Sequence, residues 1–96
     1  MKTVEEVLTC ESPYFGMKQS TLETINNYVT KGLKPGGFVT AVLANDLMES
    51  IGRADSENRM TLFQIASYVY NEIPASSHGS YEIVENWIKN LREEKG

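Results

Sequence analysis

The sequence predicts an all-α fold, a small four-helix bundle preceded by an N-terminal arm or short helix. Apolar residues recur at helical spacing in four segments, and short stretches rich in Gly, Pro and Ser separate these segments. No run of residues alternates between apolar and polar with a period of two, as a half-buried strand would. A chain of 96 residues is one domain by length. We expect residues 1–19 to form the arm and residues 20–96 to form the helical domain.

The arm is expected to contain a short helix over residues 3–9. Thr3 precedes Glu6 by three residues, which is the spacing of a capping box at a helix N-terminus. Pro13 and Gly16 then interrupt the chain before the helical domain.

A second capping box, Ser20 with Glu23, predicts the first long helix, from about Thr21 to Lys31. Apolar residues follow at the spacing i, i+3 and i+7, and these are Leu22, Ile25 and Val29. Gly32 suits the left-handed conformation in which many helices end.

The segment after Pro35 is the most apolar part of the chain. Gly36 and Gly37 form a turn, and a helix is expected from there to about Ile51, where Gly52 ends or bends it. Apolar side chains surround almost the whole circumference of this helix: Phe38, Val39, Ala41, Val42, Leu43, Ala44, Leu47, Met48 and Ile51. Such a helix is buried on more than one side, and the short chain has little material to cover it. We therefore expect a homo-oligomer.

The third helix is capped by Asp55 or Ser56 and reaches Glu72 or Ile73, where Pro74 stops it. Its apolar face is expected to be wide and to consist of Leu62, Phe63, Ile65, Ala66, Val69, Tyr70 and Ile73.

A loop of small residues, 75–79, leads to the last helix, which Ser80 can cap. The apolar stripe of that helix comprises Ile83, Val84, Trp87, Ile88 and Leu91, so Trp87 is expected in the core.

Composition and charge exclude several classes of function. The chain is 41% hydrophobic and 23% charged with a net charge of −4, and its basic residues are scattered among acids, so no long nucleic acid is expected as a partner. Cys10 is the only cysteine, which rules out an intramolecular disulfide. Neither a signal peptide nor an apolar run long enough to cross a bilayer is present, so we expect no membrane association and a location in the cytoplasm.

No catalytic or metal-binding signature is recognisable, and we expect neither an enzyme nor a cofactor. His78 is the only histidine, and it is expected to hydrogen-bond locally or to face water. Paired Cys/His spacing and HExxH are both missing, which argues against zinc. Asp46, Glu49 and Asp55 can in principle hold Mg²⁺, but acids on helices are usually solvated or cap a neighbour.

The sequence offers two groups of candidate ligand-binding residues, at the Gly-Gly turn and at the Asn-Asp pair. Gly36 and Gly37 lead through Phe38 into a helix N-terminus, where exposed backbone N–H groups suit a phosphate. The alternative is a tight turn between helices in which the glycines supply positive φ. Asn45 and Asp46 are expected in mid-helix, where they either hold the backbone of a neighbouring loop or read the edge of a ligand such as a purine.

A polar corner is expected between the second and third helices. Arg53 and Arg59 can clamp a phosphate there, or one of them forms a surface pair with Asp55, and Asn58 lies in the same corner. Tyr68 falls outside the apolar face of its helix, and is either an interface residue or a platform on which a base stacks.

Three strings carry a resemblance to a known family: PGGFVTAVLANDL at 35–47, GRADSEN at 52–58 and YVYNEIP at 68–74. This pattern resembles a widespread group of small bacteriophage proteins, and looks like the phage anti-CBASS sponge family. The likeness covers about Thr21 to Trp87 and leaves out residues 1–19. CBASS is a bacterial immune pathway in which a cyclase makes a cyclic nucleotide after infection.

The resemblance implies a non-enzymatic homotetramer in the host cytoplasm that binds 3′,3′-cyclic GMP–AMP (3′,3′-cGAMP) and keeps it from the host's effectors. For such a ligand we expect the phosphates at the Gly36 and Gly37 amides with Arg53, Arg59 and Lys34. The bases are expected against Tyr68, Phe38, Asn45 and Asn58. The alternative function is a helical phage effector that binds and inhibits a host protein.

Overall fold

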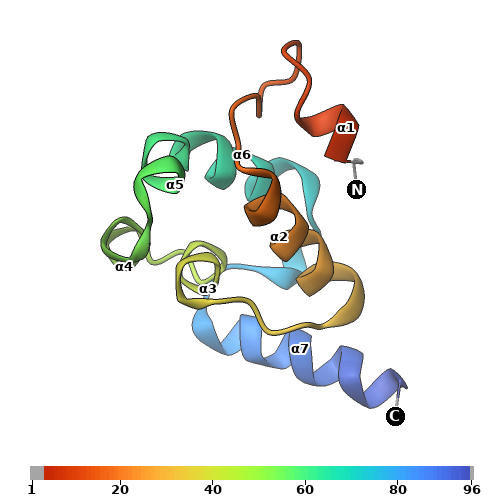
Figure 1. Cartoon of the computed structure of the whole chain (residues 1–96). Helices are drawn as coiled ribbons and strands as arrows, with labels where there is room; N and C mark the ends of the chain where they lie inside the picture. The colour runs from red at the N-terminus through yellow and green to blue at the C-terminus, as the bar shows by residue number, and fades with distance from the viewer. Residues whose placement is uncertain (1–3, 96) are drawn as a thin grey trace.

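The computed structural model describes residues 4–95, with the side chains of residues 5–93. All regular elements in this range are helical, which confirms the all-α class. They are α1 (Val4–Val7), α2 (Gln19–Lys31), α3 (Gly37–Leu43), α4 (Leu47–Arg53), α5 (Ser56–Met60), α6 (Leu62–Glu72), the 3₁₀ turn η1 (Ala75–Ser77) and α7 (Tyr81–Lys95) (Figure 1). The expected four-helix bundle is not what forms, because two of the four predicted helices are each divided in two.

The apolar helix predicted after Pro35 is broken at Asn45, which has a left-handed φ of 62°. Asn45 N–H donates to the Val42 carbonyl at 3.1 Å, and Asp46 N–H donates to the Ala41 carbonyl at 2.9 Å. This pair of hydrogen bonds is the Schellman motif that ends a helix, with Asn in the position usually taken by Gly. The prediction of one continuous helix was wrong because it weighed apolar periodicity and overlooked this use of Asn.

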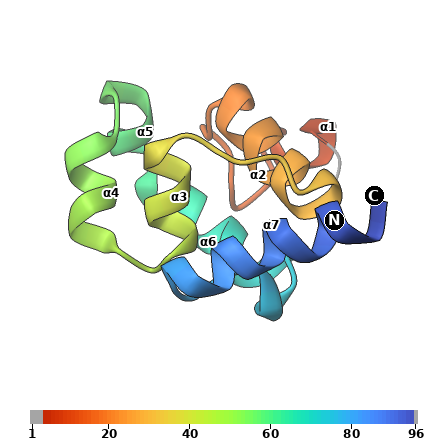
Figure 2. The same cartoon turned by 90° about the horizontal axis from the view of Figure 1, so that it is seen from below.

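Asp46 starts the next helix at the same point. Its carboxylate accepts a hydrogen bond from Glu49 N–H at 3.3 Å, so Asp46 is the N-cap of α4. Tyr81 OH donates to the other carboxylate oxygen of Asp46 at 2.7 Å, which ties the α3–α4 junction to the start of α7. In both views α4 lies at the opposite end of the molecule from the C-terminus (Figures 1 and 2).

The third predicted helix is also divided, at Thr61, whose φ of −115° separates α5 from α6. The Thr61 hydroxyl donates to the Glu57 carbonyl at 2.8 Å, a local bond that competes with regular helix geometry. Both ends of this segment agree with the prediction: the Asp55 carboxylate accepts from Asn58 N–H at 2.8 Å, and α6 ends at Glu72.

The two remaining long helices form close to where the sequence places them. Gly32 ends α2 with a φ of 69°, and the Ser80 hydroxyl accepts from Ile83 N–H at 3.1 Å at the start of α7. The second capping box does not form, because α2 begins at Gln19 and Ser20 lies inside its first turn. Thr3, half of the first capping box, lies outside the described residues.

The core is built from α2, α3, α6 and α7, with the first segment of the chain packed on it. Tyr14 and Met17 are buried, so the expected arm contacts the helical domain. Tyr28 reaches through the core and donates its hydroxyl to the Ser77 carbonyl at 2.6 Å. Trp87 is half-buried against the same cluster.

The predicted apolar face of α6 is only partly correct, since Ile65, Val69 and Ile73 are buried as expected but other members are not. Tyr68 is fully buried, whereas Phe63 and Tyr70, both assigned to the apolar face, are among the most exposed side chains of the described chain. Tyr68 is stable in the core because its hydroxyl donates to Asn26 Oδ1 at 2.6 Å and its ring meets the edge of Tyr14, with centroids 5.5 Å apart.

The Schellman ending predicts a specific response at Asn45. Replacing Asn45 with Ala should lower the free energy of unfolding by about 1 kcal/mol, because a side chain with Cβ but no local hydrogen bonding disfavours the left-handed conformation. Asn45→Gly is the matched control and should retain or raise stability. Urea denaturation measures both, and an Ala variant as stable as the Gly variant would contradict this role.

Candidate functional site

The candidate site surrounds Gly36 and Gly37, where the chain enters α3. A hollow of about 260 Å³ lies on one side of this turn and includes Lys18, Thr21, Phe38 and Asn58 in its lining. A second hollow, of about 420 Å³, lies on the other side and includes Lys34, Thr40, Asp46, Arg53 and Tyr81. Gly37 lines both hollows, so both border the turn.

The two glycines are not needed for an unusual backbone conformation. Among the described residues the glycines with positive φ are Gly16, Gly32 and Gly79, so the expected turn with positive φ at Gly36 and Gly37 does not form. Gly37 instead permits a close approach. A Cβ at this position would lie 2.8 Å from Nη1 of Arg53, so the missing side chain lets the guanidinium lie against the backbone.

Arg53 is oriented by its own helix. Its Nε donates to Glu49 Oε1 at 3.0 Å, an i,i+4 pair that is exposed on both sides and adds little stability. Within the described chain the two terminal nitrogens of Arg53 make no hydrogen bond, so their N–H groups remain available to a ligand that enters the second hollow.

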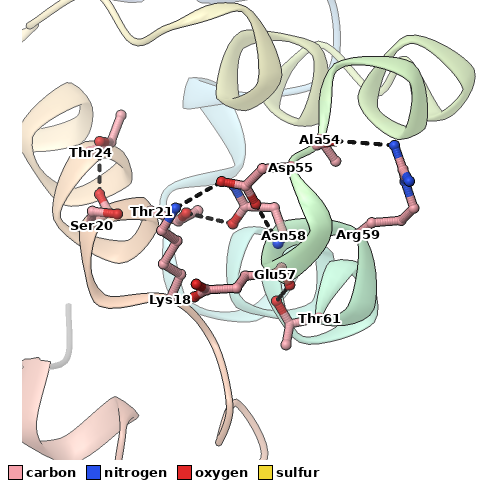
Figure 3. A network of polar contacts seen from close by, with 10 residues as sticks. All are labelled: Lys18, Ser20, Thr21, Thr24, Ala54, Asp55, Glu57, Asn58, Arg59 and Thr61. Atoms are coloured by element: carbon pink, nitrogen blue, oxygen red, sulfur yellow. Dashed lines mark hydrogen bonds and ion pairs between the residues drawn. The ribbon is translucent and has the colours of Figure 1, made fainter.

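A polar network shapes the first hollow (Figure 3). Lys18 Nζ lies 2.7 Å from Asp55 Oδ2, and the second carboxylate oxygen of Asp55 accepts from Asn58 N–H. The hydrogen bond from Lys18 lowers the pKa of Asp55, and the same contact raises the pKa of Lys18, so both groups stay charged near neutral pH. The expected pairing of Asp55 with an arginine does not occur, because Lys18 takes that place.

Asn58 is held by this network in a defined orientation. The Thr21 hydroxyl donates to Asn58 Oδ1 at 2.6 Å, and Asn58 is nearly buried. The side-chain oxygen of Asn58 accepts from Thr21 and its backbone N–H donates to Asp55, whereas its side-chain amide nitrogen has no partner within the described chain. Asn58 therefore presents N–H donors beside the Gly36–Gly37 turn.

The structure brings five of the eight predicted site residues together around the turn: Gly36, Gly37, Phe38, Asn58 and Arg53. Tyr68 is in the core, which rules out the expected stacking platform or interface role for the chain as folded here. Arg59 donates Nη2 to the Ala54 carbonyl at 3.2 Å and is turned away from Lys18 and Thr21 (Figure 3).

Asn45 lies in a different place, on a hollow of about 470 Å³ between α3 and α6 that Tyr70 and His78 also line. It is exposed at a helix end, so the expected pair of polar residues in mid-helix was wrong. Neither of the two roles considered for Asp46 describes its contact here, since its carboxylate caps α4 by accepting from Glu49 N–H and does not bind a neighbouring loop.

Lys18 and Thr21 were missed at the sequence level. Each contacts a residue 37 positions away, and these pairings depend on how α2 and α5 pack. Thr21 follows no motif that would have identified it, because a hydroxyl next to Leu22 is common on a helix surface.

The second hollow continues into the largest groove of the described chain, about 600 Å³ along α3 and α7, with which it shares Lys34, Thr40 and Tyr81. Val84 and Ile88 give the groove an apolar floor, and its rim carries both basic and acidic side chains.

No family model, curated protein or solved structure matches the chain. Within the described residues no group of three or more His, Cys, Asp or Glu side chains is placed to hold a metal ion. None of the helices in that part of the chain is both long and apolar enough to cross a membrane.

His78 departs from its expected environment. It is partly buried, and Nε2 is shielded from solvent without a hydrogen-bond partner in the described chain, so this nitrogen neither bonds locally nor faces water. Burial disfavours the charged imidazolium and lowers the pKa of His78 below its usual 6.5.

This shift predicts a pH dependence of stability. The unfolded chain takes up a proton at the ordinary pKa of His78 and the folded chain takes it up at lower pH, so the stabilising contribution is complete above pH 6.5. It is lost as the pH falls from there through the folded-state pKa. Urea denaturation at several pH values should show this loss in the native chain and a smaller one in His78→Gln. An NMR titration that gives His78 a pKa above 6.5 would contradict the burial argument.

Proposed function

We propose that this protein binds and sequesters a cyclic dinucleotide at the Gly36–Gly37 turn and so blocks CBASS signalling, without catalysing a reaction. The ligand that the sequence resemblance implies is 3′,3′-cGAMP. The observation that carries the proposal is the convergence of Gly37, Arg53 and Asn58 around one turn, although they come from three helices.

The chemistry of the turn fits a phosphodiester. The Arg53 guanidinium lies against Gly37 with its terminal N–H groups unbonded, and nothing lies within 4 Å of a Cβ placed on Gly36, so a phosphate oxygen can approach the turn there. Lys34 adds a cation to the same hollow and forms no ion pair within the described chain. The carboxylates of Asp46 and Glu49 line the same hollow, so its charges balance and the proposed phosphate contact relies on the unbonded Arg53 and Lys34 donors.

The other side of the turn fits a base. Phe38 is half-buried at the edge of the first hollow and offers an aromatic surface, while Asn58 supplies N–H donors that can meet an acceptor on a purine. A base and the adjoining phosphate of one ligand can therefore occupy the two hollows that border Gly37.

A single chain does not enclose a cyclic dinucleotide at this turn. The two hollows have volumes of about 260 and 420 Å³ and are open to solvent, whereas tight sites bury most of a ligand of this size. We propose that copies of the chain complete the walls in a homo-oligomer, a tetramer by the resemblance.

A second candidate function is a helical effector that binds a host protein. The observation that favours it is a set of large apolar side chains exposed on the described chain, with Met48, Met60 and Phe63 among them. Mass spectrometry of the purified protein separates the two candidates, since a sponge should release an intact nucleotide on heat denaturation and an effector should copurify with a protein.

Calorimetry against a panel of cyclic dinucleotides tests the proposal. The native chain should bind at least one of them with a Kd in the low micromolar range or tighter, about −8 kcal/mol. Arg53→Ala should weaken binding by about tenfold or more, because a charge-assisted contact to the phosphate is lost. Arg59→Ala is the matched control and should bind as the native chain does, since Arg59 lies away from the turn. No heat with any ligand, or equal losses in the two variants, would refute this site.

Sequestration also predicts that the nucleotide survives. After long incubation with an excess of protein and heat denaturation, chromatography should recover the ligand unchanged. Recovery of a linear dinucleotide or mononucleotides would show hydrolysis and would replace sequestration with catalysis.

A further inference from the structure

Helix α4 exposes most of its apolar side chains. Leu47, Met48 and Ile51 fall at positions i, i+1 and i+4 and so share one side of the helix, and all three are exposed, Met48 by 76%. The helix packs mainly against α3, where Ser50 is buried. Seven residues form a helix that is marginal by itself, so a surface that covers its apolar side would stabilise it.

A second apolar stripe runs along α6 and the turn before it. Met60, Phe63 and Tyr70 are exposed by 85%, 81% and 80%, and Ala66 lies exposed between Phe63 and Tyr70. This spacing places Phe63, Ala66 and Tyr70 on the side of α6 opposite the core residues Ile65 and Tyr68.

The two stripes border a common hollow. Leu47 from α4 and Ala66 from α6 both line it, so one member of each stripe lies at the same hollow. The rest of its lining is mixed, with the apolar Val42 and Leu62 beside the polar Asn45, Asp46 and Ser50. We call this surface the α4–α6 face, and its exposed members are Leu47, Met48, Ile51, Met60, Phe63, Ala66 and Tyr70. None of these side chains is charged.

The area of the α4–α6 face is that of a protein interface. Its large side chains expose roughly 840 Å² together, taking about 200 Å² for each when fully exposed. The largest apolar patch on an ordinary monomer is about 300–600 Å², and one partner in a stable complex buries about 800 Å².

We propose that the α4–α6 face is the surface through which two copies of this chain associate, each presenting the same face to the other. The inference rests on the proposed function, which already requires a homo-oligomer, and it adds the surface through which the copies contact each other. A second copy is favoured over a foreign protein because it is present whenever the chain is. A face reserved for a foreign partner would leave this large apolar area in water until that partner arrived.

Light scattering on the full chain, without nucleotide, tests the inference. The native protein should have a mass of at least twice 10.8 kDa, and the double variant Met48→Glu/Phe63→Glu should lower that mass at least twofold. Burying four like charges in one symmetric interface is strongly unfavourable. Because both side chains are exposed in the single chain, circular dichroism should show that the variant remains folded.

Leu33→Glu is the matched control. Leu33 is also an exposed apolar residue, but it follows Gly32, which packs against Leu91 near the C-terminal end of α7. Helix α4 lies at the opposite end of the molecule from that end of α7 (Figures 1 and 2). This variant should keep the native mass. A native mass of 10.8 kDa, an unchanged mass in the double variant, or an equal loss of mass in the control would overturn the inference.

The rate at which peroxide oxidises the methionines of the native protein is a second test of the inference. In the assembled protein Met48 and Met60 should oxidise as slowly as the buried Met17. In the double variant, which retains Met60, that residue should oxidise several times faster than in the native protein. Rapid oxidation of Met48 and Met60 in the native assembly would show that this face is open and would refute the inference. Protection that depends on a copurified protein would refute it in favour of a foreign partner.

These results separate the two proposals. A chain that assembles through the α4–α6 face yet binds no cyclic dinucleotide would support the inference and end the proposed function. A chain that binds the nucleotide but stays assembled in the double variant would support the proposed function and overturn the inference.

Discussion

The backbone reversal at Asn45 and Asp46 sets how α3, α4 and the start of α7 lie against one another. Asn45 ends α3 with a left-handed residue, and Asp46 begins α4 immediately afterwards. Without this reversal the apolar segment would continue as one helix, as its periodicity suggests. With it, α4 returns beside α3, Arg53 reaches Gly37, and the Asp46 carboxylate is left to accept from Tyr81 on α7.

Helix α4 consequently serves two surfaces. Its C-terminal Arg53 lies against the Gly36–Gly37 turn, while Leu47, Met48 and Ile51 face solvent. Helix α4 packs mainly on α3, and its seven residues would not form a stable helix without that packing. Association through its apolar side would fix the helix and the orientation of Arg53 with it, so the proposed assembly and the proposed ligand site are mechanically connected.

Short motifs predicted part of the local structure. The caps at Asp55 and Ser80 and the left-handed Gly32 each depend on a few neighbouring residues, and all three are present. Other local signals misled, since α2 begins before Ser20 and the helix end at Asn45 was not predicted. Sequence reasoning also failed where a distant partner decides. Tyr68 is buried because Asn26, 42 positions away, accepts its hydroxyl, and periodicity cannot reveal that bond. Part of the site was predictable, since Gly36, Gly37 and Phe38 are contiguous, but the contribution of Lys18 and Thr21 required the packing of α2 against α5.

We propose that the Gly36–Gly37 turn receives a phosphate of a cyclic dinucleotide, and a crystal structure of the full chain with 3′,3′-cGAMP is the decisive experiment. A phosphate oxygen should lie within hydrogen-bond distance of an Arg53 terminal nitrogen and beside Gly37, with a base against Phe38 and Asn58. A ligand seated elsewhere, for example in the hollow formed by Asn45, Tyr70 and His78, would contradict it.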